Sequence, residues 1–290
     1  MFFFLLDIIL KLQEKLKISV LACHFNHRLR GAESDDDEKF VKKICEKRGI
    51  TCLIGGAEEK NKYKNEAEAR EARYSFFQKI LEEGSANKIA LAHHLNDFAE
   101  TMVLRLIRGT GLRGLRSIPA LRGNFVRPIL ILSRTEIIRY LKENDLPFCT
   151  DSTNSDLVYS RNFVRHKVIP LFETLNPSVV ESLGKAGRLI ATDYDFLEKS
   201  AKDYLDKIIL EENDENIILS YPLWQKLHPS IQNLVLRLSI EKITDLADLS
   251  AMQLLEIVDM LNKGCGNKKK ILPRSLHIEL GSGKIMLFKK

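Results

Sequence analysis

The stretch LAHHLNDFAETMVLRLIRGTGLRGL, residues 91–115, passes from a short apolar run through a helical pattern into a glycine-rich turn. If a helix begins near His93, then His93, Asp97 and Glu100 fall within roughly 60° of one another, because each residue turns an α-helix by about 100°. The opposite side of this helix is apolar and can face a core; it carries Leu95, Phe98, Met102 and Leu106. The pattern predicts an imidazole and two carboxylates on one helix face, directly after a strand.

This pair of carboxylates is a candidate catalytic group. Asp97 and Glu100 could hold Mg²⁺ or orient an incoming amine. An ordinary capped helix with solvated acids is the alternative, because acidic side chains are favoured near helix N-termini. A zinc site is disfavoured, since the spacing matches no common zinc pattern.

The chain around this stretch alternates short apolar runs with helical patterns. Strands are predicted at residues 18–25, 50–55 and 88–92, and helices at 34–49 and 65–84. Nearly continuous apolar strands that alternate with helices indicate a parallel sheet covered on both faces. The fold class is therefore α/β.

A second polar cluster follows the first predicted strand. The sequence HFNHRLRG, residues 24–31, contains His24, Asn26 and His27. Open α/β sheets bind ligands outside the carboxyl ends of their strands. We expect this cluster and His93 to share a ligand cleft, although either histidine alone could be a structural group.

The region after the predicted helix is rich in arginine. Residues 101–135 contain seven arginines and neither Asp nor Glu, which favours a polyanionic partner over a solvated basic face. Arg108 precedes a G-x-G-x-x-G run and Arg113 lies within it. The run follows a helix, so the dinucleotide fingerprint lacks its context and a phosphate- or RNA-contacting loop is predicted. Further along, Arg161 and Arg165 are helically spaced and form either a cationic site or a plain surface helix.

The remaining sequence indicates a second domain and excludes several protein classes. A long amphipathic helix is predicted at 177–212, followed by a small α+β unit that ends in a hairpin at 275–288. No apolar run reaches the roughly 20 residues of a membrane span, and residues 1–10 are expected to form a core-facing helix. The five cysteines are scattered, and no two of them form a C-x-x-C motif. We therefore expect no disulfide framework, and we expect the protein to reside in a reducing cytoplasm.

In this order, the segments HFNHRLRGAES, EAEAREARYSFF, residues 91–115 and DSTNSDLVYSRNFVRHKVIPLFETLNP resemble the tRNA(Ile)-lysidine synthetase family. The resemblance implies an N-type ATP pyrophosphatase fold, a Rossmann-like parallel sheet of the adenine nucleotide alpha hydrolase type. It divides the chain into a catalytic domain at 1–176, a linker helix at 177–212 and a tRNA-binding domain at 213–290. It also implies a reaction in which ATP adenylates the wobble cytidine of tRNA(Ile) with a CAU anticodon and the ε-amine of free lysine then displaces AMP.

The resemblance also implies residue roles. Asp97 and Glu100, with Mg²⁺, would position lysine, while Arg108 would stabilise the breaking triphosphate. ATP would lie against His24, Asn26, His27, His93 and Arg108, with Arg70 and Arg73 nearby. RNA would meet Arg113, Arg161 and Arg165. A homodimer is compatible with these expectations, and a membrane partner is not expected.

One family feature is missing from these 290 residues. The family opens with a strand and an S-G-G-x-D-S loop that binds the phosphates of ATP, so we expect weakened ATP binding and a gap between the strands ending at His24 and His93. A misplaced start or a truncated sequence is the favoured explanation over an evolved variant. The alternatives in function are a tRNA thiolase, which the lack of C-x-x-C disfavours, and a non-catalytic tRNA-binding remnant.

Overall fold

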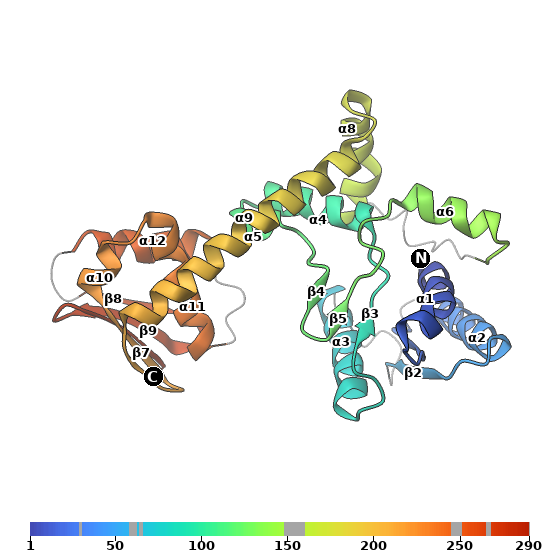
Figure 1. Ribbon diagram of the computed structural model, residues 1–290, viewed down its shortest axis with the longest axis horizontal. Helices are drawn as coiled ribbons and strands as arrows, with labels where there is room; N and C mark the ends of the chain where they lie inside the picture. Colours follow the sequence, from blue (N-terminus) through green and yellow to red (C-terminus); the bar gives the residue numbers. More distant parts are fainter. Residues whose placement is uncertain are drawn as a thin grey trace. The chain divides into compact units, whose positions relative to one another are not determined.

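The computed structural model describes residues 1–28, 31–57, 63, 66–147, 160–244, 251–264 and 268–289 (Figure 1). Residues 151–154, whose sequence DSTN is typical of a turn, and two of the cysteines, Cys149 and Cys265, lie outside the described residues. The chain forms two compact units, each with its own core. The first comprises Met1–Thr101 and Ile118–Gly184, and the second comprises Met102–Ser117 and Lys185–Lys290.

Parallel strand pairs form the centre of the first unit. β1 (Ala22–Asn26) pairs in parallel with β2 (Cys52–Gly56). β3 (Ile89–Ala90) pairs in parallel with β5 (Phe125–Val126), which also pairs antiparallel with β4 (Leu121–Arg122). The predicted α/β fold with parallel strands is confirmed. The strands form two separate sheets, however, and in the described part of the chain no strand lies between β1 and β3, where the resemblance places one.

Helices cover both faces of the β1–β2 pair. On one face, α1 (Phe2–Leu16) and α2 (Ala32–Lys47) pack their apolar side chains with Ala22 of β1. On the other face, α3 (Glu66–Glu82) packs with Cys23 of β1 and also with β3, which it therefore links to the first sheet. Successive residues of a strand point to opposite faces, so one strand contributes to both cores. The first ten residues form a core-facing helix, as predicted.

A polar network joins α1 to two other helices of this unit. The carboxylate of Asp7 is buried and lies 3.1 Å from the Arg48 guanidinium and 2.8 Å from the Tyr140 hydroxyl, which donates to it. Tyr140 belongs to α6 (Arg134–Glu143), which begins with a capping box between Ser133 and Glu136. Burial opposes ionisation of Asp7, but Tyr140, Lys11 and Arg48 outweigh it, so the pKa of Asp7 lies below its usual value.

The stretch at residues 91–115 forms α4 (Leu95–Ile107). A glycine loop and the short helix α5 (Leu112–Leu115) follow it. The later segment forms α7 (Ser160–Phe163), a π-helical turn (Val164–Val168) and α8 (Ile169–Leu175). The long helix predicted at 177–212 is α9 (Val179–Ile208); it ends at Ile208 because the chain there enters strand β6.

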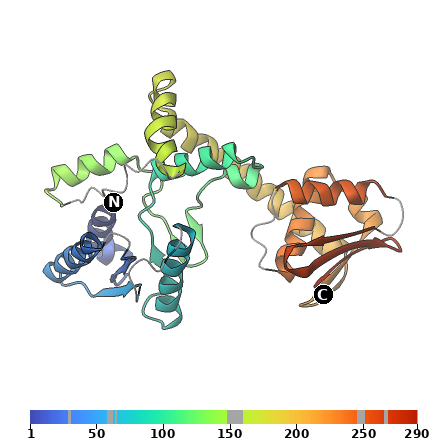
Figure 2. The ribbon, with the colours of Figure 1, turned by 180° about the vertical axis from the view of Figure 1, so that it is seen from behind.

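The second unit is built on a five-stranded antiparallel sheet with the order β6-β7-β10-β9-β8. Its strands are β6 (Ile209–Glu212), β7 (Asn216–Ser220), β8 (Lys268–Leu272), β9 (Leu276–Gly281) and β10 (Lys284–Lys289). The helices α10 (Tyr221–Gln225), α11 (Pro229–Ile243) and α12 (Ala251–Asn262) share one core with the sheet, and Figure 2 shows them gathered on one side of it. The predicted α+β unit is present.

The hairpin at the end of the chain is also confirmed. β9 and β10 pair antiparallel through a turn at Ser282 and Gly283, both of which have positive φ. This is the signature of the two-residue turn that matches the twist of a hairpin. Elsewhere, none of the helices in the described residues has both the length and the apolar character that a membrane span requires.

Candidate active site

The first turn of α4 places Asp97 at the end of the β3 segment. Asp97 Oδ2 accepts a hydrogen bond from the backbone N–H of His94 at 3.0 Å and lies 3.5 Å from His94 Nε2. This contact satisfies a donor that the helix start would otherwise leave open. The Asp97 side chain remains 14% exposed, so it is mostly but not fully buried.

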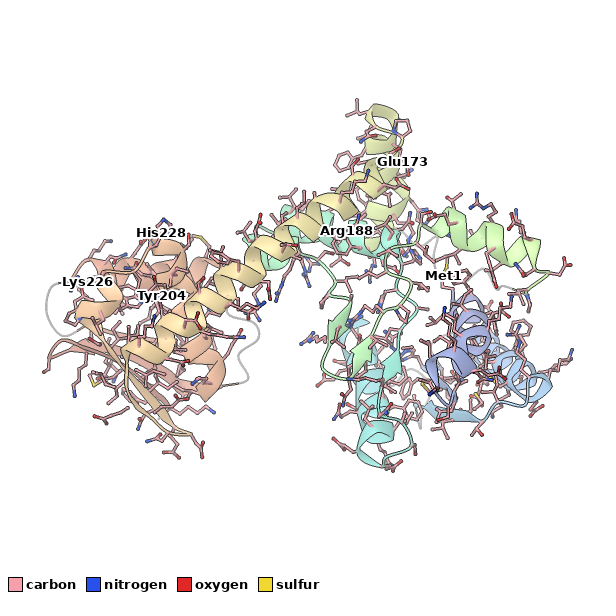
Figure 3. All side chains as sticks on the ribbon, viewed as in Figure 1. Met1, Glu173, Arg188, Tyr204, Lys226 and His228 are labelled. Carbon is pink, nitrogen blue, oxygen red and sulfur yellow. The ribbon has the colours of Figure 1, made fainter. Side chains whose placement is uncertain are left out.

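Glu100, one turn later, is held by two arginines. Its side chain is 2% exposed; Arg161 Nε lies 3.1 Å from Oε2, while Arg165 places Nε 2.7 Å from Oε1 and Nη2 3.0 Å from Oε2. Arg161 also donates to the Thr101 hydroxyl at 2.9 Å. By contrast, Glu173 on α8 is exposed (Figure 3). Both oxygens of the Glu100 carboxylate are therefore used by guanidinium groups.

A π-helical turn carries one of these arginines. Arg161 lies in α7, and Arg165 lies in the turn Val164–Val168. The wide turn is an uncommon local structure that is frequent at functional sites. Burial disfavours the charge of Arg165, but its hydrogen bond to Glu100 and the charges of Glu100 and Asp97 outweigh this and raise its pKa. The Arg165 guanidinium is thus kept charged beside α4.

His93 lies among charged groups from several elements of the first unit. Its pKa is lowered to about 4, chiefly by burial; Asp97 opposes this, whereas Arg127, Arg70 and Arg161 reinforce it. His93 Nδ1 is buried and has no hydrogen-bond partner among the described residues. In a neutral imidazole, a nitrogen that has no partner can donate a hydrogen bond to a ligand or accept one from it.

A second imidazole lies at the end of β1. Burial, the charge of Arg73 and the neighbouring His24 lower the pKa of His27 to about 4. His27 packs edge-on against Phe25 and Tyr63, with ring centroids 4.9 Å and 5.9 Å away. Burial also lowers the pKa of His24. Since Arg73 and Arg70 lie on the same helix, α3 presents one arginine toward His27 and another toward His93.

Asn26 was predicted to contact a cofactor, but its side chain has other partners. It is 3% exposed, its Nδ2 donates to Asp35 at 3.1 Å and Glu38 at 3.0 Å, and its Oδ1 accepts from the Arg28 backbone at 2.8 Å. These bonds tie β1 to α2. A ligand role for Asn26 stays a prediction.

The arrangement does not fit Mg²⁺ at Asp97 and Glu100. The oxygens of Glu100 are engaged by Arg161 and Arg165, and Asp97 Oδ1 lies 3.6 Å from Arg165 Nη2. Among the residues that the structure describes, no group of three or more His, Cys, Asp or Glu side chains could hold a metal ion. The two carboxylates instead contact the guanidiniums of Arg161 and Arg165.

The arginines of the glycine loop belong to the second unit. Arg108 is exposed directly after α4, whereas Arg113 forms an ion pair with Glu241 of α11. Arg105 donates to the carbonyls of Gly114 and Ser117 at 3.0 Å and 2.8 Å, which fixes the loop. RNA contacts by Arg113, Arg161 and Arg165 stay predictions, as does the action of Arg108 on a triphosphate.

Two contributors were missed from the sequence. Arg127, at the end of β5, is 6% exposed and donates to the Pro119 carbonyl at 2.9 Å, yet its charge reaches His93. His94, the neighbour of His93, is buried against Asp97. The available signal for Arg127 was its position directly after the apolar pair Phe125 and Val126.

The chain is similar to known proteins over most of its length. Residues 3–172 match the PP-loop domain. The chain belongs to the PP-loop family. Among similar curated proteins is the tRNA(Ile)-lysidine synthase of Clostridium tetani, 32% identical over 98% of this chain and 62% of that protein. Those of Bacteroides thetaiotaomicron and Clostridium acetobutylicum are 42% and 38% identical over 72% and 74% of this chain, and over 51% and 48% of their own lengths.

These relatives confirm the resemblance to tRNA(Ile)-lysidine synthases. The chain spans between 48% and 62% of the length of these three. A solved structure, the U34-tRNA thiolase of Methanococcus maripaludis, aligns with a TM-score of 0.51 and 18% identity over 63% of this chain and 68% of that one. This likeness supports the PP-loop fold alone.

Proposed function

We propose that this PP-loop protein is a tRNA(Ile)-lysidine synthase. It would use ATP to activate the wobble cytidine of tRNA(Ile) with a CAU anticodon and then join free lysine to it through the ε-amine. The names of the curated relatives and the match to the PP-loop domain support the reaction class. The observation in the chain itself that carries the proposal is the clamp of Glu100 on Arg161 and Arg165.

The clamp suits a reaction that handles phosphate. Glu100 orients two guanidiniums on one side of α4, and their side chains remain 28% and 20% exposed. Guanidinium N–H groups bind phosphate oxygens in a fork geometry, and preorganised cations stabilise charge that develops as phosphate departs. Glu100 therefore acts as a positioning residue for the arginines, and the arginines would contact phosphate of ATP or RNA.

The carboxylate of Asp97 suits the second substrate. It is partly exposed, it is held by the His94 backbone N–H, and it lies on the same helix as Glu100. Lysine arrives as an ammonium ion, so a fixed carboxylate would bind it and favour loss of a proton as it attacks. His93 stays neutral near pH 7, and its buried Nδ1, which has no hydrogen-bond partner among the described residues, would form a hydrogen bond with a nucleotide that enters beside it.

Lysine incorporation tests the proposal. The chain would be incubated with ATP, radiolabelled lysine and a tRNA(Ile) transcript with a CAU anticodon, and label in RNA would be counted. We expect label that depends on ATP and is lost with a CAU-to-GAU anticodon change. RNA binding without label would support a non-catalytic tRNA-binding protein, and sulfur transfer to the transcript would support a thiolase.

A further inference from the structure

Three arginines of the second unit surround one buried tyrosine. Tyr194 of α9 is 5% exposed, and the guanidinium of Arg116 lies 4.5 Å from the centre of its ring. Burial raises the pKa of Tyr194, while the charges of Arg113, Arg116 and Arg237 oppose that rise. We call Arg113, Arg116 and Arg237 the arginine cluster.

Two carboxylates face this cluster. Glu241 pairs with Arg113, and Glu198 lies 3.8 Å from Arg116. Arg237 and Glu241 share a face of α11, since they are four residues apart. Burial lowers the pKa of Arg237, and the positive charge of Arg113 lowers it further. Two like charges are therefore held close together, with Glu241 as the neighbouring anion.

The ion pair of Arg113 and Glu241 is open to solvent, unlike the clamp on Glu100. The two side chains are 36% and 30% exposed. Ion pairs at such exposure contribute about 0–1 kcal/mol, because water and salt screen them. A stronger anion can therefore replace Glu241 at little cost.

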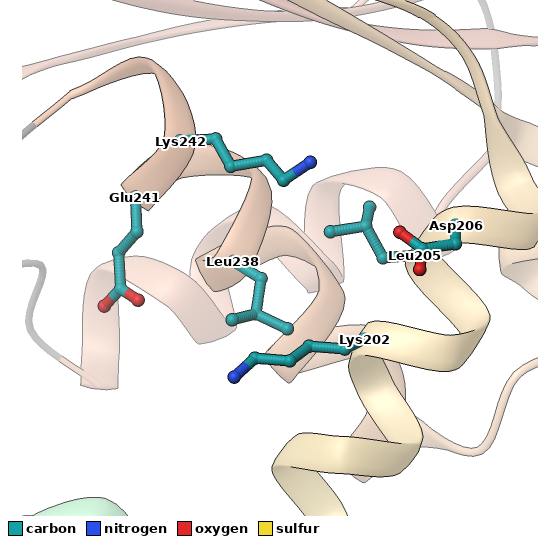
Figure 4. Close-up of a pocket in the computed structure, with 6 residues that line it drawn as sticks. All are labelled: Lys202, Leu205, Asp206, Leu238, Glu241 and Lys242. Atoms are coloured by element: carbon teal, nitrogen blue, oxygen red, sulfur yellow. The ribbon is translucent and has the colours of Figure 1, made fainter.

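A pocket continues from the cluster between α9 and α11. It has a volume of about 380 Å³ and is lined by Lys202, Leu205, Asp206, Leu238, Glu241 and Lys242. Figure 4 shows the ammonium of Lys202 and the carboxylate of Glu241 extending toward one side, with Asp206 across the pocket. Lys242 is engaged by Glu212 at 2.6 Å. Lys202 thus adds a cation next to the arginine cluster.

We propose that the arginine cluster and Lys202 bind the phosphate backbone of an RNA strand, and that a phosphate takes the place of Glu241 beside Arg113 and Arg237. The inference rests on the proposed function, which supplies a tRNA partner. Planar guanidinium forks match phosphate oxygens. Arg116 lies against the Tyr194 ring, and Lys202 follows Tyr194 on α9 by eight residues, so these two cations are placed at points roughly 12 Å apart along the helix. That spacing is longer than one phosphate group and therefore suits a nucleic-acid backbone over a free nucleotide.

Salt-dependent binding of the full chain to a fluorescent tRNA(Ile) transcript, without ATP or lysine, tests this inference. Arg237→Gln is expected to weaken binding and to lower the slope of log K against log salt by about one, because one phosphate contact is lost. Glu241→Gln is expected to strengthen binding several-fold, because the phosphate no longer competes with a carboxylate. Arg188→Gln is the matched control: this arginine of α9 is exposed (Figure 3) and lies outside the cluster, so its slope should be unchanged.

Three outcomes would overturn the inference. Unchanged slopes for Arg237→Gln, with lower melting temperatures for both Arg237→Gln and Glu241→Gln, would mean that the cluster only holds the fold. If Arg237→Gln lost the binding of inorganic phosphate but bound RNA normally, the cluster would be a site for small anions. Lysidine synthesis with an unchanged slope would contradict this inference and leave the proposed function intact. A lower slope for Arg237→Gln without lysidine synthesis would instead support this inference and contradict the proposed function.

Discussion

Arg165 grips the buried carboxylate of Glu100 with two N–H groups, at 2.7 Å and 3.0 Å, across 65 residues of sequence. Arg161 reaches the same carboxylate from the preceding turn. A carboxylate with 2% exposure needs such partners, because an ion without them would lose its hydration uncompensated. The clamp therefore fixes the segment that carries both arginines to α4, and it is the first target for mutation.

Glu100→Gln should destabilise the first unit by about 3 kcal/mol, because it leaves two partly buried guanidiniums beside a neutral amide. Urea unfolding measures the change. Glu173→Gln is the control in the same unit, since that glutamate is exposed and should change stability by less than about 0.5 kcal/mol. Equal midpoints for the two variants would show that the clamp contributes nothing to stability.

Asp97→Asn and Asp97→Ala should separate capping from catalysis. Asparagine keeps an oxygen that can accept the His94 N–H, whereas alanine removes it at a cost of about 1 kcal/mol. Both variants lose the charge that would hold the lysine ammonium, so both should abolish lysine incorporation, and only alanine should lower the melting temperature noticeably. Normal incorporation by Asp97→Asn would exclude the proposed ammonium contact.

The free energy of unfolding should fall as the pH is lowered from about 6.5 to about 4. His27 and His93 have pKa values of about 4 in the folded chain and 6.5 when unfolded, chiefly because burial disfavours their charged forms. Between those values the unfolded chain binds protons that the folded chain does not, so stability drops with falling pH. Urea midpoints across this range measure the drop, and a His93→Asn variant should show a shallower one.

Asp7→Asn should weaken the junction of α1, α2 and α6. The change removes the charge that Arg48 and Tyr140 contact, and a loss of about 1–3 kcal/mol is expected from the partners left in a part-buried site. Lys11→Gln is the matched control: it removes the charge that pairs with the same carboxylate, but its side chain is 55% exposed. A thermal melt should show a clear decrease for the first variant and little change for the second.

Gly114→Ala should disturb the glycine loop, whereas Gly111→Ala should not. A Cβ at Gly114 would lie 1.9 Å from Thr110 Oγ1, while a Cβ at Gly111 would have nothing within 4 Å. Overpacking of this kind typically costs about 1–3 kcal/mol. Limited proteolysis within residues 105–117 reports on loop order. Equal cleavage of the two variants would show that Thr110 moves aside freely.

The sequence predicted where helices and strands form better than which parts of the chain pack against them. Helical periodicity located α4, and the apolar side of that helix is buried at Leu95, Phe98 and Met102. Leu106, placed on the same apolar face, is 61% exposed, because periodicity identifies a face and does not show where its covering layer ends.

The site shows the same limit. Spacing along the chain predicted that Arg161 and Arg165 share a helix face, and that Asp97 and Glu100 share another. It could not show that the two faces meet, because that contact is made in three dimensions by residues about 60 positions apart. The metal hypothesis arose from two carboxylates whose arginine partners were not visible in the sequence.

The π-helical turn that carries Arg165 makes the length of this segment critical. Removing one residue between Arg161 and Arg165 would swing the second guanidinium about 100° around the helix axis, away from the Glu100 carboxylate. The segment can therefore accept substitutions at its other positions but not deletions. A change in the number of residues there would separate Arg165 from Glu100 even if every charged side chain were retained.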